Sequence, residues 1–121
     1  MRSVFLIPLL LAATCLSTGG ALAQGECVEP PMPAAVQGTA VSPDQMRAAM
    51  AEAHTFIAQA SVYQECLLKE VEAGKTQAAA GGQPFEPMIE TSARYKVEAS
   101  KKAQERVGAA ANGALTAFKN H

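Results

Sequence analysis

The chain has 121 residues, of which 49% are hydrophobic and 17% are charged, and its 10 Lys and Arg are balanced by 11 Asp and Glu. This balance excludes a polybasic nucleic-acid-binding protein, because such a protein must neutralise many phosphates. The length allows one domain at most. With no tryptophan, 5% aromatic residues and many alanines, the chain has little side-chain bulk to enclose a large ligand cavity.

Residues 1–23 have the pattern of a cleaved signal peptide. Arg2 supplies a positive charge, residues 4–16 form an apolar run, and residues 21–23 read Ala-Leu-Ala, the small-x-small form that a signal peptidase cuts. Cleavage there would leave Gln24 at the new N-terminus. We therefore expect a periplasmic or secreted protein.

The alternatives to cleavage are an uncleaved anchor and a lipoprotein acylated on Cys15. The apolar run of about 13 residues is shorter than the ~20 that cross a bilayer as a helix. We expect no transmembrane segment after processing.

Two cysteines, Cys27 and Cys66, remain in the mature chain, and export to an oxidising compartment predicts that they form a disulfide. The closed loop of about 40 residues would remove roughly 4 kcal/mol of freedom from the unfolded chain. Because redox catalysis usually requires a Cys-x-x-Cys pair, we expect the bond to be structural.

Residues 24–42 form a proline-rich segment. Three prolines between positions 30 and 33 exclude a helix and favour extended polyproline geometry. Ser42-Pro43-Asp44-Gln45 then predicts the start of a helix, because serine caps free amides, proline suits the first turn and glutamine completes a capping box.

Two amphipathic helices are predicted, over residues 43–73 and 87–119, with a linker over 74–86. Gly74 predicts the end of the first helix, although residues 76–80 could add a turn of helix to either neighbour. Its apolar stripe, with alternating three- and four-residue spacing, is Met46, Ala49, Ala53, Phe56, Ala60, Tyr63 and Leu67. The apolar positions of the second helix are Ile89, Ala93, Val97, Ala103, Val107, Ala110, Ala111, Ala114, Leu115 and Phe118.

Helices of this length would span roughly 45 to 50 Å, so the predicted fold is all-α, a long antiparallel two-helix hairpin. A Cys27–Cys66 bond requires the proline-rich segment to run back along the first helix as an extended strap. We expect Val28, Met32 and Val36 to cover the apolar groove. Because a hairpin encloses little volume, it needs the disulfide or a second hairpin in a four-helix bundle, which would make a homodimer.

Short motifs resemble a group of small, uncharacterised exported helical proteins of Gram-negative bacteria. They are a Cys27-x-x-Pro30 leader, Tyr63-x-x-Cys66-Leu67 on the first helix and Gly108-x-x-x-Asn112 on the second. The resemblance implies a periplasmic or secreted helical hairpin and no established activity. The glycine-rich connection at Gly81-Gly82 departs from the pattern of the group.

Asn112 is the most suggestive polar residue, because it lies inside an alanine-rich helix. It could hydrogen-bond across to Tyr63 or Gln64 and set the register of the hairpin, or it could simply be exposed. The other structural or interface candidates are the large side chains of the two stripes, Phe56, Tyr63, Leu67 and Phe118.

No catalytic, cofactor or metal site is predicted. His54 and His121 are the only histidines, and no second ligand lies three or four residues from His54. The chain has no Cys-x-x-Cys-His motif, no phosphate loop and no pairing of a nucleophile with a base. We expect a protein that is not an enzyme.

The first functional hypothesis is an envelope accessory that binds itself or an envelope protein through exposed Met50, Ile57, Val62 and Leu68. The alternative is a periplasmic stress-type holdase or metal-stress sensor. Residues 41–45, Val-Ser-Pro-Asp-Gln, resemble the Leu-Thr-x-x-Gln element of helical periplasmic chaperones, although the capping box explains the same residues.

Overall fold

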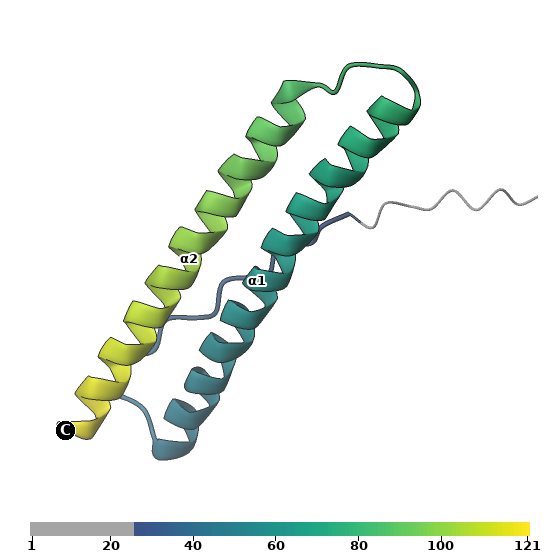
Figure 1. Cartoon of the computed structure of the whole chain (residues 1–121). Helices are drawn as coiled ribbons and strands as arrows, with labels where there is room; N and C mark the ends of the chain where they lie inside the picture. The colour runs from purple at the N-terminus through teal and green to yellow at the C-terminus, as the bar shows by residue number, and fades with distance from the viewer. Residues whose placement is uncertain (1–25) are drawn as a thin grey trace, which may run out of the picture.

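A computed structural model describes residues 26–121, which form two antiparallel helices, α1 (Pro43–Ala80) and α2 (Pro87–Lys119), preceded by an extended segment (Figure 1). No strand occurs in this range, so the all-α hairpin prediction is confirmed. The predicted signal peptide, Cys15 and Gln24 lie outside the described residues. Neither α1 nor α2 has a stretch apolar enough to cross a membrane.

The predicted capping box starts α1. Ser42 Oγ accepts a hydrogen bond from the Gln45 backbone N–H at 3.2 Å, and the Ser42 N–H donates to Gln45 Oε1 at 2.8 Å. Pro43 occupies the first turn, and the Asp44 carboxylate lies at the positive end of the helix dipole. The capping chemistry therefore accounts for residues 42–45.

The predicted end of the first helix is wrong. The helix continues through Gly74 to Ala80, and the chain turns at Gly81 and Gly82, where Gly82 has a φ of 64°. A Cβ on Gly74 would lie 3.1 Å from Cε2 of Phe85. The missing side chain of Gly74 therefore leaves room for the Phe85 ring beside the helix. The alanines that follow favour the helix and continue it to Ala80. The linker is residues 81–86.

Buried side chains form two clusters along the hairpin. The terminal core, nearer the start of α1, consists of Ala53, Phe56, Ala60, Ala103 and Val107. The loop core, nearer the linker, consists of Tyr63, Leu67, Val71, Ala93 and Val97, with Cys27 and Phe85 packed against it. Both clusters use the stripes that the apolar spacing predicts. Ile89, by contrast, is about half exposed.

The strap, residues 26–42, lies against both helices, as predicted, and Figure 1 shows it passing α1 and reaching α2 before α1 begins. Gly38 is buried, and a Cβ there would overlap the carbonyl oxygen of Ala114 and lie 3.0 Å from the Phe118 nitrogen. Only glycine allows this approach of strap to helix. A turn, with Ala40 N–H bonded to Gln37 O at 3.0 Å, then leads to α1.

The prediction that Val28 covers the groove is wrong, since Val28 is 79% exposed, whereas Met32 is 55% exposed but still lines the space between the strap and the helices. The partly buried strap residues recur every three positions, at Cys27, Pro30, Pro33 and Val36. A polyproline II helix has three residues per turn, so every third side chain shares a face. Val28 does not fall on this spacing.

Candidate functional site

The predicted disulfide joins Cys27 of the strap to Cys66 of α1, with the two Cα atoms 5.7 Å apart. Cys27 packs against the loop core, so the bond fixes one end of the strap beside buried side chains. The sequence separation of 39 residues makes this a long-range link. It holds the surface around it in one geometry.

Acidic groups surround the disulfide. Burial, followed by the negative charges of Glu29 and Glu70, raises the pKa of the Tyr63 hydroxyl above its ordinary value. One Glu70 carboxylate oxygen and the sulfur atoms of Cys27 and Cys66 all lie within 4.8 Å of one another. Because the two sulfur atoms are bonded to each other, neither is a thiolate ligand in this form.

Between the two cores, a polar bridge crosses the helix interface. The Gln64 side-chain amide donates to Ser100 Oγ at 3.0 Å and to Gln104 Oε1 at 2.9 Å. The Gln104 amide in turn donates to the Ile57 carbonyl at 2.8 Å and to Ser61 Oγ at 2.9 Å. Ser100 is only 4% exposed, so the bridge satisfies a buried hydroxyl.

This bridge takes the role that the sequence analysis offered to Asn112. Asn112 is exposed, its backbone carbonyl accepts a hydrogen bond from Thr116 Oγ1 at 2.9 Å, and within residues 26–121 it forms no hydrogen bond to Tyr63 or Gln64. The register hypothesis for Asn112 is wrong. A signal for the real bridge was available, because Ser100 continues the spacing between Val97 and Ala103 on the buried face.

The large side chains predicted as structural or interface residues differ in how deeply they are buried. Phe56, Tyr63 and Leu67 are buried in the two cores and therefore hold the helices together. Phe118 is partly buried beside the strap turn, where its backbone nitrogen lies close to Gly38. Phe56, Tyr63 and Leu67 are each only 5 or 6% exposed, so most of each side chain contacts the rest of the hairpin.

The exposed apolar side chains lie elsewhere. Of the four predicted anchors, Val62 and Leu68 are exposed, whereas Met50 and Ile57 are partly buried. The sequence analysis missed further exposed side chains, which are Met88, Ile89 and Tyr95 on α2. The sequence of α2 alone could not show that α1 does not cover these side chains.

Two surface depressions include Val62, Met88 and Ile89. The disulfide surface, around the Cys27–Cys66 bond, is lined by Val28, Pro30, Pro31, Val62 and Tyr63. The loop-end groove, between the helices, includes Leu67, Val71, Met88 and Ile89.

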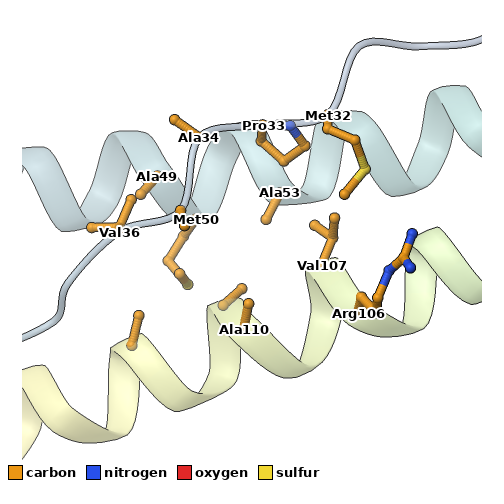
Figure 2. A pocket seen from close by; sticks show the side chains of 13 residues that line it. Met32, Pro33, Ala34, Val36, Ala49, Met50, Ala53, Arg106, Val107 and Ala110 are labelled. Atoms are coloured by element: carbon orange, nitrogen blue, oxygen red, sulfur yellow. The ribbon is translucent and has the colours of Figure 1, made fainter.

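A third depression, the strap cavity, lies between the strap and both helices and has a volume of about 200 Å³. Figure 2 shows side chains from all three segments converging on it, including Met32 and Val36 from the strap, Met50 from α1 and Val107 from α2. Its volume is below the ~300 to 1,000 Å³ of ordinary ligand pockets.

An ionic cluster connects the helices near the linker. Lys75 Nζ lies 2.9 Å from a Glu90 oxygen, 3.6 Å from a Glu72 oxygen and 5.9 Å from the centre of the Phe85 ring. The Arg94 guanidinium lies 2.6 Å from Glu90. Hydrogen bonds from Arg94 and then Lys75 lower the pKa of Glu90, and the hydrogen bond to Glu90 is the largest cause raising the pKa of Lys75.

No protein-family model, curated protein or solved structure matches this chain. The resemblance to small exported bacterial proteins stays a prediction. The function proposed below depends on the chain's own geometry.

Proposed function

We propose that the protein is exported by its signal peptide and acts without catalysis, as an envelope accessory that binds another protein. The binding site is the disulfide surface. The partner is an envelope protein or a second copy of the chain.

The observation that carries this proposal is the exposure of two valines in one depression beside the disulfide. Val28 on the strap is 79% exposed and Val62 on α1 is 68% exposed, and both line the disulfide surface. Contiguous apolar exposure is typical of interaction sites. A covalent bond between the two segments holds these side chains in position before binding, which lowers the ordering cost of association.

The proposal is tested by photo-cross-linking in the natively exported protein. A cross-linking residue at Val62 is expected to give one discrete adduct, and the same residue at Lys101, exposed on α2, is expected to give none. Val28→Asp should abolish the Val62 adduct, because a charge would be buried at the interface. An adduct of twice the chain mass identifies a homodimer, and any other discrete mass identifies a heterologous partner.

Other results would contradict the proposal. Equal labelling at both positions, or an adduct that survives Val28→Asp, would show that the disulfide surface is not the binding site. Suppression of the aggregation of an unfolded client by the purified protein, with no discrete adduct, would indicate the holdase alternative. Stoichiometric zinc uptake at Cys27, Cys66 and Glu70 after reduction would indicate the metal-stress sensor.

A further inference from the structure

The strap cavity forms where small side chains of both helices face the strap, and the strap cannot move closer to the helices to fill the space. Ala110, Ala111 and Ala114 supply its α2 wall, and Ala49 and Ala53 supply part of its α1 wall. The disulfide fixes one end of the strap, and the close fit of Gly38 against Ala114 fixes the other. Between these two points, the strap spans the alanine walls and leaves space beneath it.

The middle of the strap, residues 28–36, covers the cavity and is held there by side-chain contacts. Within residues 26–121, no backbone hydrogen bond joins residues 28–36 to either helix. Met32 and Val36 extend from this part of the strap over the cavity, as Figure 2 shows. A segment that is fixed at both ends and has no hydrogen bonds to the helices between them can move away from the helices locally while the hairpin stays folded.

Arg106 is the only charged residue among the 13 that line the cavity. Its side chain is drawn at one end of the cavity, beside Val107 and opposite Met32 (Figure 2). In the part of the chain that the structure describes, the Arg106 guanidinium forms no ion pair, unlike Arg47 and Arg94. The cavity therefore combines apolar walls with one exposed cationic side chain.

We propose that the strap cavity binds a single-chain amphiphilic anion, with its hydrocarbon chain beneath the strap and its carboxylate on Arg106. Charge complementarity selects an anion, and a guanidinium can hold both oxygens of a carboxylate. The cavity volume of about 200 Å³ accommodates about seven groups of ~30 Å³ each, which matches the hydrocarbon tail of a medium-chain fatty acid. The site is separate from the disulfide surface.

Octanoate is the probe, added to the purified natively exported protein and followed by calorimetry and by NMR shifts of the cavity methyl groups. We expect saturable binding at one site per chain. Octylammonium, which has the same chain and the opposite charge, should bind at least about tenfold more weakly. Equal binding of the two probes would overturn the role of Arg106, and no saturable octanoate binding would overturn the proposal.

Two variants with matched controls locate the site. Arg106→Gln should weaken octanoate binding about tenfold or more, because it removes a charge-assisted hydrogen bond, whereas Lys102→Gln on exposed α2 should change it less than twofold. Ala110→Leu should fill the cavity and abolish binding, whereas Ala109→Leu, outside the cavity, should not. Circular dichroism melting of each variant reports whether it folds.

A membrane-surface origin of any binding is tested separately. The test is co-sedimentation of the protein with phosphatidylglycerol vesicles. If the Ala110→Leu variant still binds both the vesicles and octanoate as the unmodified protein does, the association lies outside the cavity and the proposal is overturned. Loss of octanoate binding in Ala110→Leu but not in Ala109→Leu would support it.

Discussion

Near the linker, the two helices close on each other through large side chains, whereas near the start of α1 they meet largely through alanines. The loop core brings Tyr63 and Leu67 against α2 and adds the Lys75 and Glu90 ion pair. The terminal core has Phe56 as its one aromatic side chain, and the strap lies beside it. The strap therefore acts as a third packing element where the side chains of the helices are small.

The largest expected effect comes from removing the disulfide, which fixes the strap at the boundary between the two halves. Replacing both cysteines, Cys27→Ser with Cys66→Ser, should lower the free energy of unfolding by about 4 kcal/mol, because the unfolded chain regains its loop freedom. Thermal unfolding followed by circular dichroism measures this loss. The double replacement leaves no unpaired thiol to complicate the comparison. An unchanged transition would show that the strap does not depend on the bond.

Gly38→Ala should disturb only the terminal half. The added Cβ would overlap the Ala114 carbonyl oxygen, so the strap must move away from α2 at a cost of about 1 to 3 kcal/mol. Gly113→Ala is the matched control, because a Cβ there meets nothing within 4 Å, and it should stabilise α2 by up to about 1 kcal/mol. Denaturant titration measures both changes, and equal effects would contradict the close fit of the strap.

The polar bridge separates the two halves and can be tested by a double-mutant cycle. Gln64→Ala should cost about 1 to 3 kcal/mol, because it leaves the buried Ser100 hydroxyl without its Gln64 partner. Ser100→Ala in the same background should cost less than it does alone. The four free energies of unfolding give the coupling directly, and strict additivity would exclude a direct interaction.

The ionic cluster of the loop half should give the smallest effect, visible as a pH dependence. The pKa of Glu90 is lowered from its ordinary value of 4.5, so its contribution is present above pH 4.5 and lost as the pH falls below that value. The pKa of Lys75 is raised from 10.5, so its contribution is present below pH 10.5 and lost as the pH rises above it.

Melting temperatures from pH 2 to pH 7 for the unmodified protein and Glu90→Gln measure the acid limb. The two curves should differ near neutral pH and converge at the acid end, where the carboxylate is protonated in both states. A constant difference across this range would show that the effect of the substitution is not the loss of the charge. The difference should be small, because Lys75 and Glu90 are both partly exposed to solvent, which weakens their interaction.

The two helices, their buried stripes, the capping box of α1 and the pairing of Cys27 with Cys66 could all be predicted from the sequence. These features depend on local chemistry and on periodic spacing, which a linear chain displays directly. The strap was also predictable, because prolines exclude a helix and the disulfide sets where it must lie. The predicted export follows from residues 1–23, which lie outside the described structure.

The tertiary structure was needed to show which strap side chains face inward, where α1 ends and which residues of α1 contact Ser100 and Gln104. Val28 is exposed because the strap repeats every three residues, and Gly74 is helical because its missing side chain admits the Phe85 ring. Ser100 and Gln104 meet Gln64 across a distance of 36 to 40 residues in sequence. Such contacts depend on the relative rotation and register of two helices, and local residue preferences carry no information about either.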